Sequence, residues 1–174
     1  VVESSGRSQE ARFRSALDLI SKDISDTEQR YRTTIARLAL SETLKGKLYV
    51  YNKYWGFFSK DTLDGDIAVL RDELENQLLS GAIDSIAVYR TEGDHYSSVV
   101  VVGNSTYIHV SLPRDTPGRL AGQAEYAQTS DGIYATFYIP VFRDGEEIGL
   151  LAMQKAFNRG EGSRGCRWNC RRRR

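Results

Sequence analysis

The sequence predicts an α+β domain in which a long N-terminal helix packs on a five-stranded antiparallel sheet. Apolar residues recur at helical spacing through the first half of the 174-residue chain. From Ile83 onward the apolar spacing changes to two, which is typical of strands, and turn residues separate the successive segments. Because the helices come first and the strands follow without helices between them, we expect an antiparallel sheet covered by helices on one face.

Residues 8–45 are predicted to form one continuous helix. Apolar and semi-apolar positions recur in alternating steps of four and three, at Phe13, Leu17, Ile20, Ile24, Thr27, Tyr31, Thr34 and Leu38. This spacing is a heptad seam, and a helix of this length would extend about 57 Å, more than a small domain can cover. Two interpretations stay open: a dimerising stalk that carries a signal, or an amphipathic helix packed on its own domain. Each could hold for one half.

A second, shorter helix is predicted for residues 66–79. Its apolar positions follow helical spacing, Asp64 or Asp66 can cap its start, and Gly81 lies where a helix would end. The segment before it, residues 47–63, is rich in aromatic side chains.

The five strands are predicted at residues 83–90, 96–102, 106–112, 133–142 and 147–157. Asp144-Gly145 favours a type I′ hairpin turn between the last two strands. Residues 113–132 form a polar connection that is too long to be a simple turn.

Side-chain alternation along these strands predicts two different faces. One face is apolar and should meet the long helix, and it carries Ile86, Val88, Ile108, Val110, Ile133, Ala135, Phe137, Ile139 and Val141. The other, which we call the tyrosine face, gathers Tyr89, Tyr107, His109, Tyr134, Thr136 and Tyr138. Tyrosine offers apolar area together with a hydroxyl that needs a partner. The face is therefore either the wall of a binding pocket closed by residues 49–63 and 113–132, or a solvated sheet surface.

Other candidate ligand-binding residues lie near the strand ends. Arg90, Arg114 and Arg119 could bind a carboxylate if they point inward, and the rings of Tyr54 and Trp55 could hold a cationic amine instead. His109 could make a pocket sensitive to pH, and Asp131 is either a turn residue or an anchor for an amine. A surface histidine and a solvated arginine are the plainer alternatives.

The sequence carries no motif of an enzyme. It lacks a phosphate-binding glycine loop with a following Lys-Ser or Lys-Thr, and it lacks a Gly-x-Ser-x-Gly turn. His95 and His109 are the only histidines, and both cysteines, Cys166 and Cys170, lie near the C-terminus. We therefore expect no catalytic residue, no metal site and no cofactor.

Charge divides the chain into a predicted domain at residues 1–158 and a basic tail at residues 159–174. The tail carries seven arginines and one acid, which leaves residues 1–158 with 17 basic and 22 acidic residues and a net charge of −5. The tail is either a basic arm for phosphate or anionic lipid, or an appended sequence foreign to the domain. The acidic body argues against nucleic-acid binding. No run is long and apolar enough for a transmembrane helix, and we expect the chain to be part of a longer protein.

The final hairpin resembles that of the Cache family, the PAS-like extracytoplasmic sensor domains of bacterial receptors. The residues that carry the resemblance are Tyr138-Ile-Pro140-Val-Phe-Arg-Asp144-Gly145-Glu-Glu-Ile-Gly149-Leu-Leu-Ala-Met, together with the order of elements over residues 8–157. The resemblance implies a single-Cache fold in the periplasmic or extracellular part of an inner-membrane protein. It implies that a small ligand is bound and that the signal passes to a histidine kinase, a diguanylate cyclase or a chemotaxis module.

The same resemblance implies a class of ligand. Family members that bind amino acids carry a set of Tyr, Arg, Trp, Tyr and Asp, and the residue types match here at Tyr54, Arg90, Trp55, Tyr134 and Asp131, with a different spacing. The expectation is therefore the broader class of small carboxylates, amino acids and amines, bound by a homodimer that pairs through the long helix. A dimerisation module with no ligand of its own is the alternative.

Overall fold

The computed structural model describes residues 2–57, 60–78, 83–104, 108–120, 122–129 and 132–157. The described elements follow in the order α1 (Val2–Ala39), α2 (Glu42–Lys53), α3 (Lys60–Leu78), β1 (Ser85–Glu92), β2 (His95–Gly103), β3 (Ser111–Pro113), α4 (Thr116–Leu120), β4 (Glu125–Thr129), β5 (Gly132–Arg143) and β6 (Glu146–Phe157). The basic tail at residues 159–174 lies outside the described residues.

The strands form one antiparallel sheet in the order β3-β2-β1-β6-β5-β4. The predicted α+β class is confirmed, but the described sheet has six strands, so the count of five is wrong. The additional strand, β4, and the short helix α4 both lie inside the connection predicted at 113–132. β4 is an edge strand whose residues Glu125 to Gln128 are all exposed, so no apolar alternation marks it. Of the strand predicted at 106–112, the described residues 108–110 are not in a strand, and β3 is Ser111–Pro113.

The single helix predicted for residues 8–45 is divided into α1 and α2. Ser41 ends the continuity because its hydroxyl caps α2, accepting a hydrogen bond from the Leu44 amide at 3.3 Å. The same hydroxyl donates to Glu73 of α3 at 2.5 Å, so the cap also joins two helices. The predicted second helix is confirmed, but it begins at Lys60 instead of Asp66.

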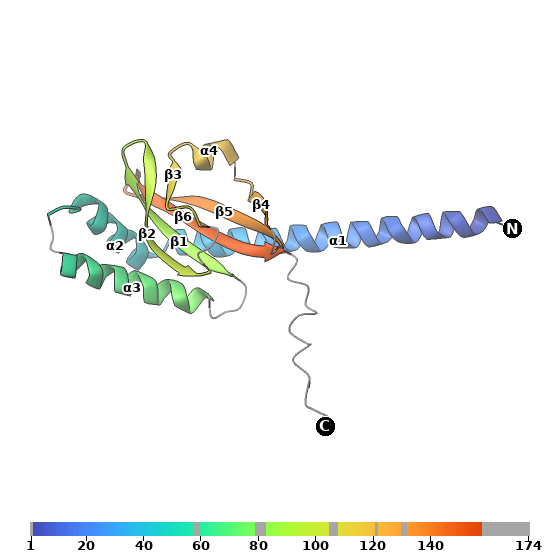
Figure 1. Ribbon diagram of the computed structural model, residues 1–174, viewed down its shortest axis with the longest axis horizontal. Helices are drawn as coiled ribbons and strands as arrows, with labels where there is room; N and C mark the ends of the chain where they lie inside the picture. The colour runs from blue at the N-terminus through green and yellow to red at the C-terminus, as the bar shows by residue number, and fades with distance from the viewer. Residues whose placement is uncertain are drawn as a thin grey trace, which may run out of the picture.

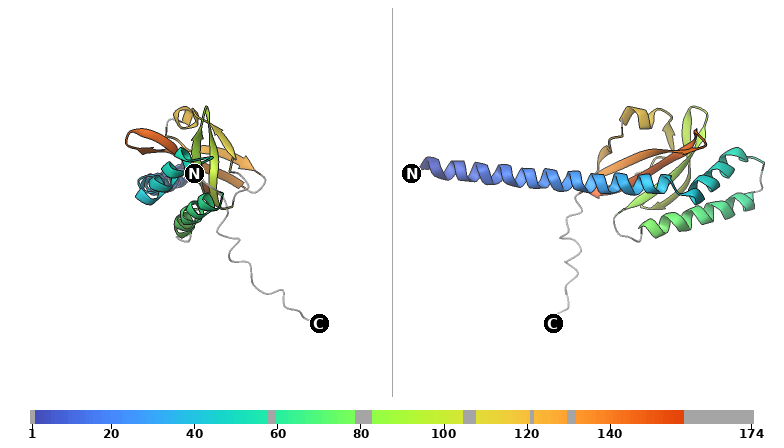
Figure 2. Two further views of the ribbon diagram at one scale, coloured as in Figure 1. Left: turned by 90° about the vertical axis from the view of Figure 1, so that its left-hand side faces the viewer. Right: turned by 180° about the vertical axis from the view of Figure 1, so that it is seen from behind.

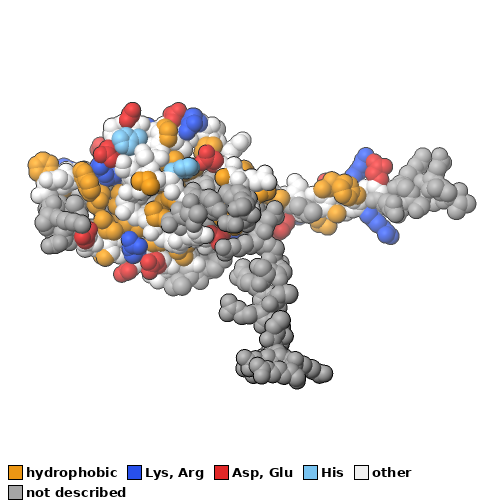
Figure 3. Space-filling view, in the orientation of Figure 1, with side chains coloured by type: hydrophobic (Ala, Val, Ile, Leu, Met, Phe, Trp, Pro, Cys, Tyr) orange, Lys and Arg blue, Asp and Glu red, His pale blue; other side chains and the backbone are white. Residues whose placement is uncertain are grey.

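The two halves of α1 lie in different surroundings (Figures 1 and 2). The C-terminal half packs on the sheet, where the Tyr31 ring lies 5.9 Å from the ring of Phe137 on β5. The part of α1 that precedes Tyr31 projects away from the sheet and carries apolar side chains on its surface (Figure 3). Its seam residues Phe13, Leu17 and Ile24 are 66%, 49% and 41% exposed. The packed-helix interpretation therefore holds for the C-terminal half, while the N-terminal seam is uncovered. No described helix combines the length and the apolarity that crossing a membrane requires.

The main core lies between the sheet and helices α1 to α3. Ala135, Phe137 and Val141 of β5 are buried in it, and Ile139 packs against it, as the alternation predicts. Helix residues such as Leu48 fill the other side. The prediction is wrong for residues 108–110, because they precede the short strand β3 and follow no strand alternation. Val110 is exposed, and Ile108 packs against the cluster on the opposite face.

Two β-bulges and one tight turn shape the centre of the sheet. Val99 is the extra residue in β2 and Ile148 the extra residue in β6, because the pairing register shifts there. Next to the second bulge, a Cβ on Gly149 would meet the carbonyl oxygen of Tyr89 and, at 2.6 Å, the Leu48 side chain. Asp144 and Gly145 have φ angles of +52° and +81°, as the predicted type I′ turn requires.

Candidate functional site

The tyrosine face exists in the structure and lies on the side of the sheet opposite α1 to α3. Tyr138 pairs with Ala152 of β6, which pairs with Ala87 of β1, so these three side chains share one face. Tyr89 belongs to the buried cluster on that face. Thr136 and Tyr134 lie two and four residues before Tyr138 on β5, so their side chains point to the same face as Tyr138. The structure thus brings together Tyr89, Tyr134, Thr136 and Tyr138, as predicted. Tyr107 lies outside the described residues.

A separate part of the chain covers this face. Leu112 of β3 belongs to the cluster with Tyr89, and Ile108 packs against it. The Tyr89 hydroxyl donates a hydrogen bond to the main-chain carbonyl of His109 at 2.7 Å, and Tyr89 is only 1% exposed. The imidazole of His109 is exposed. His109 therefore contributes its backbone, and the predicted side-chain position on the face is corrected.

A row of polar side chains crosses the tyrosine face from β1 to β4. Ser85 pairs with Gln154, Gln154 with Thr136, and Thr136 with Glu125. The side-chain amide nitrogen of Gln154 donates to the Thr136 hydroxyl at 3.0 Å. The Ser85 hydroxyl donates to the side-chain carbonyl oxygen of Gln154 at 3.4 Å. Ser85, Gln154 and Thr136 are buried. Burying polar groups costs free energy unless they are hydrogen-bonded. On a sheet face that is merely buried by other parts of the chain, apolar side chains would be expected instead of this hydrogen-bonded row.

The hydroxyl groups of Tyr89 and Tyr138 stay protonated at neutral pH. Burial raises the pKa of Tyr138, and the Glu125 carboxylate, which accepts its hydrogen bond at 2.9 Å, raises it further. Burial also raises the pKa of Tyr89. Both phenols are therefore neutral groups that donate and accept hydrogen bonds, and Glu125 is the nearby acceptor for a cation. The small side chains of Ala87 and Ala152 lie beside them.

Three other predicted ligand-binding residues, Tyr54, Trp55 and Arg90, lie near the C-terminal end of α2. The Arg90 guanidinium lies 4.3 Å from the centre of the Trp55 ring, which follows α2, and pairs with Glu92 at 2.7 Å. Arg90 follows Tyr89 directly, so strand alternation turns it toward the helices. The Trp55 ring also lies against the Tyr51 ring, tilted by 42° with the ring centres 4.9 Å apart, and Tyr54 is the C-cap of α2. Tyr54, Trp55 and Arg90 are therefore not brought to the tyrosine face. Asp131 lies outside the described residues.

A cluster at the opposite end of the same face joins Arg114 to two residues that the sequence analysis did not single out, Tyr96 and Glu147. The Tyr96 hydroxyl donates to Glu147 at 2.5 Å, and Arg114 pairs with the same carboxylate oxygen at 3.1 Å while lying 4.8 Å from the Tyr96 ring centre. Simple alternation places Tyr96 with the core residues Val100 and Val102. The bulge at Val99 reverses that assignment, and Tyr96 joins the cluster on the tyrosine face.

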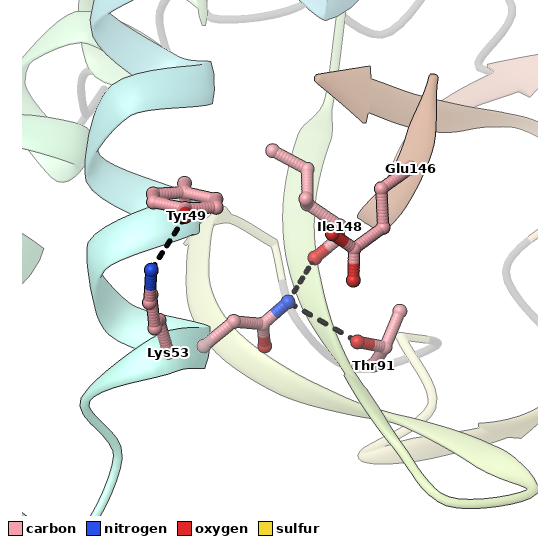
Figure 4. A pocket seen from close by; sticks show the side chains of 6 residues that line it. Tyr49, Lys53, Thr91, Glu146 and Ile148 are labelled. Atoms are coloured by element: carbon pink, nitrogen blue, oxygen red, sulfur yellow. Dashed lines mark hydrogen bonds between the residues drawn. The ribbon is translucent and has the colours of Figure 1, made fainter. Parts of the chain in front are cut away.

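A cavity of roughly 340 Å³ lies between α2 and the start of β6 (Figure 4). The Asn52 amide donates to the Ile148 carbonyl and, at 3.1 Å, to the Thr91 hydroxyl. The Lys53 ammonium donates to the Tyr49 hydroxyl at 3.0 Å. The two contacts of Asn52 tie α2 to the sheet, whereas the Lys53 contact lies within the helix. Among the described residues, no three His, Cys, Asp or Glu side chains gather as a metal site would require.

Comparisons with known proteins give only distant likenesses. No family model matches the chain, and no curated protein matches it. A solved structure of the extracellular domain of vpHK1S-Z8, a chain described as a histidine kinase, is 14% identical over 77% of this chain and 52% of that one, with a TM-score of 0.47. The sensory domain of the Campylobacter jejuni chemoreceptor Tlp3 is 12% identical over 78% of this chain and 60% of that one, with a TM-score of 0.36.

A third solved structure is that of an enzyme. The type II free methionine-R-sulfoxide reductase from Thermoplasma acidophilum is 15% identical over 56% of this chain and 82% of that one, with a TM-score of 0.42. The chain thus spans only about half of the kinase domain but most of the reductase. At these identities and TM-scores, none of the three likenesses carries an argument about function.

Proposed function

We propose that the chain is a small-molecule sensing domain of the PAS-like, single-Cache type, belonging to the extracytoplasmic part of a membrane receptor. The observation that carries the proposal is the tyrosine face: buried tyrosines and a linked polar row on a sheet face that is covered by residues 108–112. The same face turns away from the helices, so a ligand there would not disturb the main core. The fragment itself has no catalytic role in this proposal.

The chemistry of the tyrosine face supports a small polar ligand. The Tyr89 and Tyr138 hydroxyls already donate their single hydrogens, to the His109 carbonyl and to Glu125, so their oxygens can accept from an ammonium group, as can Glu125. A carboxylate would have to take the Tyr138 hydrogen in place of Glu125. Ala87 and Ala152 are the small residues of the buried cluster between Tyr89 and Tyr138. Carboxylates, amino acids and amines are therefore the ligand classes to test, and the proposal includes no cofactor and no nucleic acid.

The path for a signal runs through β5. Tyr138 lies on the tyrosine face, while its neighbour Phe137 contacts Tyr31 of α1 on the other side. A ligand that contacts Tyr138 differently in two positions of β5 would bias the position of α1 by its differential affinity for the two states. A small shift of α1 could then act at a dimer interface formed by the Phe13 and Leu17 seam and pass to an output module across the membrane.

The uncovered seam also supports a second candidate, a dimerisation module with no ligand. Phe13, Leu17 and Ile24 are exposed at heptad spacing, which is costly unless they pair. Leu17→Asp combined with Ile24→Asp should abolish dimers in analytical ultracentrifugation under either proposal. Only the sensing proposal also predicts a ligand.

A thermal-shift screen of the whole chain against small carboxylates, amino acids and amines tests the sensing proposal. Ligand at a hundredfold excess over the dissociation constant stabilises the native state by about 2.7 kcal/mol, or roughly 5–10 °C for a chain of this size. Tyr134→Ala and the milder Tyr138→Phe should weaken the shift, whereas Tyr126→Ala, at an exposed position of β4, should not. A screen without any saturable shift, while the variants stay folded, would favour the dimerisation module.

A further inference from the structure

The open edge of β5 forms a groove beside α1. β4 pairs with β5 only from Gly132 to Thr136, so among the described strands none lies against that edge beyond Thr136. α1 borders the edge on one side, and α4 with Gly122 borders it on the other. The space between them is roughly 500 Å³ and is lined by Arg32, Ile35, Ala36, Pro117, Gly118, Gly122, Phe137, Tyr138, Ile139 and Pro140.

Arg32 is the only charged side chain in this lining, and it has no partner within the part of the chain that the structure describes. Its side chain is half-buried, yet it forms no ion pair, hydrogen bond or ring contact there. The other described arginines that are buried or half-buried all have a carboxylate nearby, at 2.7 Å for Arg90, 3.1 Å for Arg114 and 3.7 Å for Arg143. A partly desolvated guanidinium beside apolar walls is a site that an anion would complete.

The backbone of the edge limits what can fill the groove. Pro140 has no N–H group, so an extended peptide could not continue a hydrogen-bonded ladder past it. A small molecule does not need such a ladder. The wall residues Ile35, Phe137 and Ile139 offer apolar contact area.

We propose that this groove binds a small organic carboxylate, whose charged group pairs with Arg32 and whose apolar body lies against Ile35, Phe137 and Ile139. The groove shares Tyr138 with the tyrosine face, but its charged anchor, Arg32, lies on α1, so the proposal does not depend on a ligand at that face. Because its lining joins α1 to β5, a molecule bound here contacts both the helix and the strand of the proposed signal path.

Isothermal titration of the whole chain tests this site with hexanoate and phenylacetate as probes and the neutral hexanamide as their counterpart. Both carboxylates should bind saturably and hexanamide at least tenfold more weakly. Arg32→Gln should lower hexanoate affinity at least tenfold, while Arg30→Gln, an exposed arginine on the same helix, should leave it unchanged. Gly118→Leu should block binding, because a Cβ at Gly118 meets only open space and the added side chain would fill the groove.

Two further measurements separate this site from the alternatives. Tyr134→Ala should leave hexanoate binding unchanged, so a loss there would place the probe on the tyrosine face. The proposal is overturned if neither carboxylate binds saturably, or if binding ignores both Arg32→Gln and Gly118→Leu. It is also overturned if Gly118→Leu dissociates a dimer in sedimentation, which would make the groove an interface with a second copy.

Discussion

Replacing Gly149 by alanine should destabilise the protein through a single added methyl group. The new Cβ would meet the main-chain carbonyl oxygen of Tyr89 and the fully buried Leu48 side chain of α2. The carbonyl is fixed by the pairing of β1 with β6, and Leu48 has no free space into which to move. Overpacking of this kind costs about 1–3 kcal/mol, which corresponds to roughly 2–12 °C in melting temperature for a chain of this size.

Urea unfolding monitored by circular dichroism measures this loss, with Gly118→Ala as the matched control. Gly118 lies in α4, and a Cβ there meets nothing within 4 Å, so the same chemical change should be neutral or slightly stabilising. If Gly149→Ala unfolds within about 0.5 kcal/mol of the parent chain, a range typical of surface substitutions, the close packing of α2 on the β6 bulge is refuted.

Three other changes test the parts around the site. Tyr89→Phe removes the hydrogen bond to the carbonyl of His109 and should cost about 1 kcal/mol of stability, with faster amide hydrogen exchange in residues 108–112. Unchanged exchange would show that other contacts hold these residues against the tyrosine face. Because the pKa of Tyr138 is raised in the folded state, the unfolded state ionises first, so stability should be full below about pH 10 and fall as the pH rises further. In urea titrations across this range Tyr138→Phe should lose less stability than the parent chain, and an identical decline would contradict the assigned burial. Ser41→Ala should cost about 1 kcal/mol by removing the α2 cap, and an unchanged unfolding midpoint would refute that role.

The larger features of the fold followed from patterns in the sequence. The heptad spacing predicted α1, and period-two alternation predicted which β5 side chains face the helices and which face away. The turn at Asp144-Gly145 was predicted because both residues tolerate positive φ. These features depend on local preference and on burial of one face, which a sequence pattern records directly.

The errors have physical reasons in particular residues. The apolar stripe continues through Leu44 and Leu48, so it concealed the cap at Ser41 that separates α1 from α2. β4 is exposed on both sides and has no apolar face to detect.

Bulges and side-chain direction account for the errors at the site. The bulge at Val99 reverses the alternation and brings Tyr96 to the tyrosine face, where its contact with Glu147 joins residues 51 positions apart. Arg90 was predicted to bind a carboxylate near the end of its strand. It directly follows Tyr89, and because neighbouring strand residues point to opposite faces, it lies away from the tyrosine face.

Alanine-methyl nuclear magnetic resonance of the whole chain, titrated with the ligand that the screen yields, tests the sensing proposal most directly. Ala87 and Ala152 lie on the tyrosine face, whereas Ala39 and Ala135 lie in the core on the helix side. The proposal predicts saturable shifts of the Ala87 and Ala152 signals, which Tyr134→Ala weakens. Shifts confined to Ala39 and Ala135, or no saturable shift at all, would contradict a ligand site on the tyrosine face.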